Sequence, residues 1–485
     1  MFAKEAFLNL ILFYGGHLNN KETRLYYQNA LSSRISALVI VCIGAFLMPL
    51  SLSASLVAIP AIATDLGANA VYVSWIPAAF ILSNLIVLLP SGRSADIYGR
   101  KRIYQLGSVI FLFGSVIAGL SQNIELLLLS RVIQGFGAGM FFGTGMAIIG
   151  SVYQDGGRGA ALGWVVACVY FGLSVGPLLG GWLTDNYGWE SVFFSMVPFI
   201  LASIILTMIK LKGEWKNENP QKLDWKGSVI LSFGLLAFFI GTTNLPELFS
   251  VGLLVVAVLL SVWFKRHSQQ VEFPIVNLNL VWQNQGLSRS LIAAIMMYGG
   301  SYGLQFLMGL YLQYNRGFSP TDAGKFLMIQ AIIMAVIAPA AGRLSDRYPP
   351  NTIAAVGCFA VVLSFVSMLF LDSDSHMAIV VISLALLGAG FGLFSTPNSN
   401  AALKSISEAK LGIASSLVSM SRLIGQLLST AFVTLMMSLY IGTAKIVPSN
   451  YEALLLVFKW TVGLSLICAL IATYTSLSVK RIKAE

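Results

Sequence analysis

The most regular feature of the sequence is a series of long apolar runs separated by short polar segments. About 20 apolar residues in a helix cross the hydrocarbon core of a bilayer. Runs of this length predict fourteen transmembrane helices, at 35–60, 73–92, 103–120, 124–150, 159–182, 191–211, 227–245, 248–264, 288–314, 322–341, 352–371, 377–398, 410–438 and 453–478. The pattern therefore indicates an all-α protein embedded in a lipid bilayer.

Two short motifs occur twice, at corresponding places in the series of helices. "GRSADIY" at 92–98 returns as "GRLSDRY" at 342–348, and "GAGMFFG" at 137–143 is similar to "GAGFGLF" at 388–394. Two related six-helix bundles are therefore expected, with two additional helices between them. We expect a cytoplasmic or interfacial lead-in at 1–34 and an N-terminal bundle at 35–212. The extra helices with their linkers are expected at 213–287, the C-terminal bundle at 288–478 and a cytoplasmic tail at 479–485.

Composition and charge support a bilayer location. The chain is 57% hydrophobic and only 10% charged, which is too apolar for a water-soluble core of ordinary proportions. Its net charge of +10 arises from basic residues in the short segments between apolar runs, so nucleic-acid binding is not expected. The four cysteines lie within apolar runs without close pairs, and we expect no disulfide framework, metal site or cofactor.

The distribution of basic residues predicts the orientation in the membrane. With fourteen spans, most of the 30 Lys and Arg residues fall at one end of the helices. That end is expected to be cytoplasmic, because cytoplasmic loops of membrane proteins are enriched in these residues. An even number of spans then places both termini in the cytoplasm, with the chain in the cytoplasmic (inner) membrane.

The segment between the second and third spans carries a family signature. Gly92, Asp96, Gly99, Arg100 and Lys101 fit the pattern Gly-x-x-x-Asp-Arg/Lys-x-Gly-Arg/Lys-Arg/Lys, from which Ile97 departs. In this motif the chain resembles the major facilitator superfamily, specifically its fourteen-helix drug:proton antiporter branch. The resemblance implies that the loop is a charged latch that stabilises one access state. The second copy keeps part of the pattern and is expected to latch more weakly; its matching residues are Gly342, Asp346 and Arg347.

Two further helices extend the resemblance. "RVIQGFGAG" at 131–139 matches the fourth-helix pattern of the family, and the fifth helix matches a glycine pattern that the family associates with exporters, at Gly163, Gly172, Gly176, Pro177, Gly180 and Gly181. Glycines four residues apart allow close helix packing, and the proline bends the helix. The first helix departs from the branch, because Ser51 stands where an Asp is usual.

Several polar residues are expected within the membrane. A charge at the centre of a bilayer costs about 2.5–3.5 kcal/mol on insertion scales, so a deep Arg suggests a functional site. Each of the two deep arginines either lines the substrate cavity, or caps backbone carbonyls or braces a helix contact. The aromatic stripe of the ninth helix lines the cavity, faces lipid or packs in the core. The candidate cavity residues are Arg131, Gln134, Arg422, Gln426, Tyr298, Tyr302, Gln305, Asn84 and Gln330.

No Asp, Glu or His is expected deep in the membrane. The candidate proton carriers therefore lie near the outer rim, at Asp65, Glu125, Asp185 and Asp322, or the substrate itself carries the proton. A bundle with arginines and no carboxylate favours anionic or neutral amphiphiles over lipophilic cations. An intramembrane enzyme would need a nucleophile, an acid–base pair or a metal site at this depth, which the residues do not supply.

The resemblance implies a secondary active exporter of small amphiphilic or organic molecules, coupled to protons and working by alternating access, as in multidrug efflux antiporters. One alternative is an exporter of an anionic metabolite or siderophore that lacks a proton-carrying carboxylate in the membrane. An importer and an intramembrane enzyme are further alternatives. The expected partners are a small-molecule substrate, protons and lipid, and a monomer is compatible with the sequence.

Overall fold

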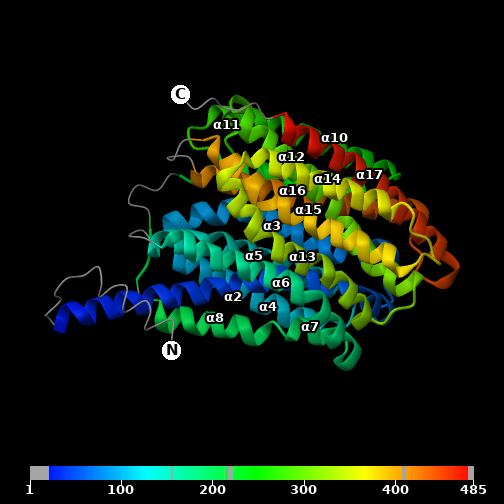
Figure 1. Ribbon diagram of the computed structural model, residues 1–485, viewed down its shortest axis with the longest axis horizontal. Helices are drawn as coiled ribbons and strands as arrows, with labels where there is room; N and C mark the ends of the chain where they lie inside the picture. The colour runs from blue at the N-terminus through cyan, green and yellow to red at the C-terminus, as the bar shows by residue number, and fades with distance from the viewer. Residues whose placement is uncertain (1–20, 154–156, 212, 217–221, 407–410, 479–485) are drawn as a thin grey trace.

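The computed structural model describes residues 21–153, 157–211, 213–216, 222–406 and 411–478, and the regular elements of this part are all helical. Fourteen of its helical segments are long and apolar enough to cross a membrane, which confirms the predicted number. They run side by side along the long axis of the molecule (Figure 1). The protein is therefore a multi-pass membrane protein.

The helices form two halves with a hairpin between them in sequence. The first half contains α2 (Lys21–Asp65), α3 (Ala70–Tyr98), α4 (Arg100–Gly119), α5 (Ile124–Val152), α6 (Arg158–Tyr187), α7 (Glu190–Phe194) and α8 (Val197–Lys210). The hairpin is α9 (Trp225–Thr243) and α10 (Leu248–Gln270), followed by the short α11 (Leu278–Gln283). The second half contains α12 (Gln285–Leu310), α13 (Pro320–Arg347), α14 (Pro350–Met368), α15 (Met377–Lys404), α16 (Leu411–Tyr440) and α17 (Tyr451–Leu477).

Some helix boundaries differ from the sequence prediction. Helix α2 begins at Lys21, so part of the expected lead-in is helical, whereas residues 1–20 and the tail at 479–485 lie outside the described residues. The sixth span is divided into α7 and α8, and α8 starts with Pro198 in its first turn. Proline has no amide hydrogen to donate and fits the start of a helix better than its middle. The ninth span ends in a π-helical turn, Tyr311–Asn315.

The internal repeat is visible in the packing of the helices. In the first half α2 packs on α6, α4 on α5, and α3 on α5; in the second half α12 packs on α16, α14 on α15, and α13 on α15. The two halves meet where α6 packs on α13 and α3 packs on α16, and the hairpin helix α9 contacts both α3 and α16. Matching pairs therefore build both halves, while the residue limits 35–212, 213–287 and 288–478 stay predictions.

The glycine pattern of α6 lies against two other helices. Gly172, Gly176 and Gly180 face α2, where a Cβ at Gly180 would overlap the backbone of Ala54. Gly181 faces the backbone of Pro320 in α13, across the boundary between the halves. Gly163 is the exception, because nothing lies within 4 Å of the position that its Cβ would occupy. Small residues thus permit backbone contact over the second part of α6 only.

The contrast between Gly180 and Gly163 gives a test of this packing. We expect Gly180→Ala to destabilise the protein by about 1–3 kcal/mol, because the added methyl group must displace the α2 backbone. Gly163→Ala lies in the same helix and should unfold like the wild type. Thermal unfolding of the detergent-solubilised variants measures both, and equal midpoints for the two variants would contradict the packing.

Candidate functional site

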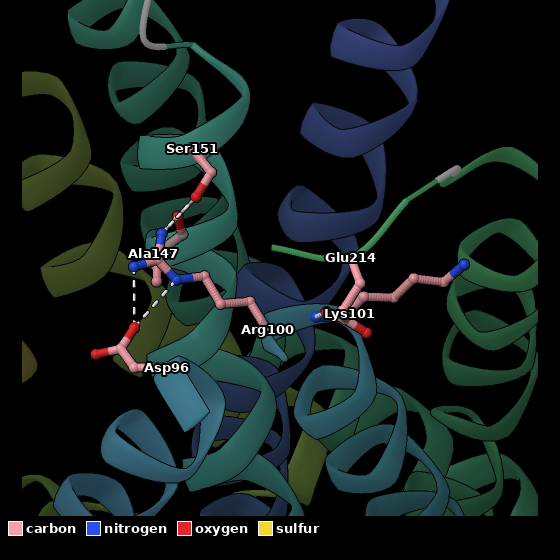
Figure 2. Close-up of polar contacts among 6 residues, drawn as sticks. All are labelled: Asp96, Arg100, Lys101, Ala147, Ser151 and Glu214. Carbon is pink, nitrogen blue, oxygen red and sulfur yellow. Dashed lines mark hydrogen bonds and ion pairs between the residues drawn. The ribbon is translucent and has the colours of Figure 1, made fainter. Parts of the chain in front are cut away.

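The two ends of the helix bundle have different charges. We call the end that carries residues 92–102 the basic end, and the end that carries Asp65, Asp185 and Asp322 the opposite end. At the basic end, Arg100 donates two hydrogen bonds to Asp96 Oδ1, from Nε at 3.3 Å and from Nη2 at 2.9 Å. Its Nη1 donates to the Ala147 carbonyl at 3.1 Å and to the Ser151 hydroxyl (Figure 2). One guanidinium therefore ties α3 and α4 to α5, all within the first half.

A linker residue completes this loop. The Glu214 carboxylate accepts the backbone N–H of Lys101 at 2.8 Å (Figure 2). It also lies 3.8 Å from the Arg102 guanidinium. Gly99 has a φ of +116°, and a Cβ there would overlap the Glu214 side chain, so this position requires glycine on both grounds. A Cβ at Gly92 would meet nothing within 4 Å. Glu214 could not be identified from the sequence, because the linker that carries it has no recognisable pattern.

The second copy of the loop is built differently. The side chains of Asp346 and Arg347 are exposed and make no hydrogen bond or ion pair with any described residue. Instead, Ser345 joins α13 to α15: its hydroxyl accepts from Asn400 at 2.7 Å, and its carbonyl accepts from Lys404 at 3.1 Å. At Gly342 a Cβ would be in ordinary contact with Thr396. The Asp–Arg pair of the first copy has no counterpart here.

Arg131 is enclosed at the centre of the first half. It is fully buried, and its Nη1 donates to Gln134 Oε1 at 2.7 Å and to Ser51 Oγ at 3.2 Å. Its Nε donates to the Ile76 carbonyl at 3.3 Å and its Nη2 to Ser55 Oγ at 3.4 Å. The Phe80 ring covers the guanidinium at 4.6 Å. Protein groups therefore occupy most of its donors, as expected of an arginine that braces a helix contact.

Arg422 is the less enclosed of the two membrane arginines. Its side chain is half-buried, and the one hydrogen bond that holds it among the described residues runs from Nη2 to Ser399 Oγ at 2.7 Å. The guanidinium lies 5.7 Å from the centre of the Tyr298 ring, a cation–π distance. Most of its donors are therefore free to bind another group. Ser399 is a polar contact that sequence reasoning missed.

Helix α12 lies between the two arginines. Tyr298 is close to Arg422, whereas the Tyr302 hydroxyl, one turn further on, is within electrostatic reach of Arg131 in the other half. Gln305 is half-buried on the same helix. Four candidate residues have a buried polar atom without a partner in the described structure: Tyr302 Oη, Gln330 Oε1, Gln426 Oε1 and Asn84 Nδ2. Buried polar atoms are normally paired, and unpaired ones often mark a place where a ligand or water binds.

The candidate proton carriers lie at helix ends. Asp65 is the last residue of α2 and accepts from Trp189 Nε1 at 2.9 Å, and Glu125 is exposed in the first turn of α5. Asp322, in the first turn of α13, pairs with Lys325 at 2.8 Å. The Asp224 carboxylate, at the start of α9, has 4% of its side chain exposed and pairs with His267 at 2.7 Å. Among the described residues, no group of three metal-binding side chains occurs.

The polar contacts between the two halves lie at the opposite end. Asp185 of α6 accepts from the backbone N–H of Thr321 in α13 at 2.8 Å and from its hydroxyl. Gln313 donates to the Val57 carbonyl at 3.0 Å, and the Ala70 amide donates to the Ala444 carbonyl at 3.1 Å. No hydrogen bond or ion pair in the described ranges joins the halves at the basic end. The hydrogen bonds that join the two halves in the described structure are thus found at the opposite end.

The two arginines should respond differently to the same substitution. Arg131→Lys is expected to destabilise the protein by about 2–3 kcal/mol, because a lysine cannot serve all the acceptors that this buried fork satisfies. Arg422→Lys should change the unfolding temperature little, because the arginine donates a single hydrogen bond among the described residues. Thermal unfolding in detergent compares them. An Arg131→Lys variant that unfolds at the wild-type temperature would show that the network does not brace α5.

Comparisons with known proteins agree with this fold. The sequence profile of the Major Facilitator Superfamily matches residues 41–430. The riboflavin transporter RibZ of Clostridioides difficile (strain 630) is 28% identical over 399 residues, which cover 81% of this chain and 86% of that protein. The tetracenomycin C resistance and export protein of Streptomyces glaucescens is 26% identical over 410 residues, covering 84% of this chain and 76% of that protein. A solved peptide transporter in complex with alafosfalin, 17% identical, superposes with a TM-score of 0.67 over 92% of this chain and 97% of that one. The chain belongs to the Major Facilitator Superfamily.

Proposed function

We propose that this transporter exports small amphiphilic organic molecules from the cytoplasm by alternating access. The observation that carries the proposal is the uneven distribution of contacts between its two repeated halves: Asp185, Gln313 and Ala70 join them at the opposite end. Within the bundle, Tyr302 Oη and other buried polar atoms have no hydrogen-bond partner among the described residues. Such a molecule has one closed end and a polar midplane, as a carrier needs.

The direction of transport is supported by three features. The basic end carries most of the Lys and Arg residues, so we assign it to the cytoplasm, and the structure then represents a state with its outer end closed. The glycine pattern of α6 resembles that of exporters, and its second part packs on α2 and α13. A relative is named as an export protein. Together these features favour export over import.

We place the proton-coupling step at the contact between Asp185 and Thr321. The carboxylate of Asp185 accepts the backbone N–H of Thr321 at the N-terminus of α13, where a helix favours negative charge. Protonation would remove that charge and weaken the contact between the halves. Asp322, the residue after Thr321, pairs with Lys325 at 2.8 Å, and Asp65 and Glu190 lie around Thr184, the residue before Asp185. A proton taken up from outside would thus favour opening of the outer end.

Everted membrane vesicles test this function, because uptake into them corresponds to export. We expect an acidic vesicle interior to drive accumulation of at least one of three labelled probes that share a naphthalene ring: 1-naphthalenesulfonate, 1-naphthalenesulfonamide and 1-naphthylmethylammonium. Asp185→Asn should lower the pH-driven accumulation about tenfold while exchange without a pH gradient continues, since it removes the titratable group and keeps the fold.

The matched control is Asp374→Asn, which changes an exposed carboxylate in the loop between α14 and α15 and should leave transport unchanged. Vesicles without the protein and vesicles with a protonophore give the background. If none of the probes accumulates above that background, the export proposal fails. If accumulation ignores the pH gradient, or Asp185→Asn behaves like the wild type, the coupling step is wrong while export stands.

A further inference from the structure

We propose that Arg422 anchors the substrate, and that the substrate is an organic anion with an oxyanion group on an aromatic or flat apolar body. This inference rests on the proposed export function and names the substrate class of its binding site. We define the Arg422 site as Arg422 and Gln426 of α16, Tyr298 of α12, and Ser399 of α15. Three different helices of the second half thus contribute to it.

The first argument is the number of donors left unused. Arg131 is fully buried and shares its donors among Gln134, Ser51, Ser55 and a backbone carbonyl. Arg422 is only half-buried and gives one hydrogen bond, to Ser399. A guanidinium carries five N–H donors in a planar fork that matches a carboxylate, sulfonate or phosphate. Arg422 therefore has N–H donors available for an oxyanion, whereas most donors of Arg131 are already used by protein groups.

The second argument is the charge around this fork. No described carboxylate lies within ion-pair distance of Arg422; the described ion pairs instead involve Asp96, Glu214, Asp224, Asp322 and Asp372. A cation in a low-dielectric interior is expensive unless an anion or several acceptors compensate it. A substrate oxyanion would supply the missing charge. A cationic substrate would instead add repulsion.

The third argument is that the protein holds this arginine beside an aromatic surface. Next to Arg422, Gly425 packs against the Ile295 carbonyl and Gly299 of α12, which brings the two helix backbones together. Tyr298 is held by its hydroxyl, 3.3 Å from Ser395 Oγ, and by edge contact with the Phe391 ring at 5.4 Å. The tyrosine face is thus fixed near the guanidinium and can stack on a flat apolar group.

The fourth argument comes from buried polar atoms that point to a ligand. Tyr302 is 8% exposed, and its hydroxyl has no hydrogen-bond partner among the described residues. Gln426 lies one helical turn from Arg422, and its buried Oε1 is also unpaired. The Gln426 amide nitrogen can donate to an oxyanion at Arg422, and Gln426 Oε1 can accept from a substrate hydroxyl or amide. The Tyr302 hydroxyl lies one turn from Tyr298 on α12, on the side of Arg131, where it can bind the rest of the substrate. Ligand binding would therefore satisfy groups that the protein leaves unpaired.

Binding of the three naphthalene probes to the full chain in lipid nanodiscs tests the anion site directly. We expect 1-naphthalenesulfonate, whose charge does not depend on pH near neutrality, to bind at least tenfold more tightly than the neutral sulfonamide. The cationic 1-naphthylmethylammonium should bind most weakly. Arg422→Gln should weaken sulfonate binding about 30-fold, equivalent to about 2 kcal/mol at 1.4 kcal/mol per tenfold change, and should leave sulfonamide binding within about twofold. Tryptophan fluorescence or isothermal titration measures the dissociation constants.

Two further variants separate recognition from folding and net charge. Arg422→Lys keeps the cation but loses the fork, so its sulfonate affinity should fall between those of the wild type and Arg422→Gln. Arg266→Gln removes an exposed arginine of α10 and should bind like the wild type. The inference is overturned if the sulfonamide binds as tightly as the sulfonate, if Arg422→Gln retains full sulfonate affinity, or if the wild type binds no sulfonate. Accumulation of the neutral or cationic probe in everted vesicles would still support export in each of these cases.

Discussion

The cost of placing a guanidinium in hydrocarbon governs the interior of this protein. Two arginines lie within the helix bundle, and no described Asp or Glu forms an ion pair with either of them. The Arg131 guanidinium is stabilised by hydrogen bonds to side-chain oxygens and one backbone carbonyl, and by the Phe80 ring. Arg422 is left with Ser399 and the face of Tyr298. The arginine of the first half therefore stabilises the packing of its helices, whereas the arginine of the second half keeps hydrogen-bond donors that can bind a ligand.

Close helix packing determines where the two halves can move. Gly181 and Gly324 bring α6 and α13 into backbone contact near the opposite end, and Asp185 caps the start of α13 there. At the basic end, the Asp96–Arg100 pair holds helices of the first half to one another. Hydrogen bonds and close packing therefore hold the helices within each half together. The described hydrogen bonds between the two halves lie at the opposite end. A rigid-body rotation of one half against the other therefore breaks the few hydrogen bonds at the opposite end and leaves the bonds within each half intact.

Much of the fold could be predicted from the sequence, because helix length and hydropathy follow from the thickness of a bilayer. The fourteen spans and the duplicated motifs at 92–98 and 342–348 needed no tertiary information. The roles of single side chains, by contrast, could be assigned only from the tertiary structure. Both arginines are candidate cavity residues in the sequence, and in the structure Ser51, Ser55 and Ile76 enclose Arg131. Glu214 and Ser399 contribute through contacts distant in sequence, so no local pattern could identify them.

Alternating access is the central claim of this account, and distances measured at both ends of the bundle test it most directly. Spin labels at Tyr98 and Tyr348 report on the basic end, and labels at Tyr187 and Phe370 report on the opposite end; all four side chains are exposed. When a transported probe is added or the external pH is lowered, the account predicts that the first distance shortens as the second lengthens. Distances that stay fixed, or that change in the same direction at both ends, would contradict it.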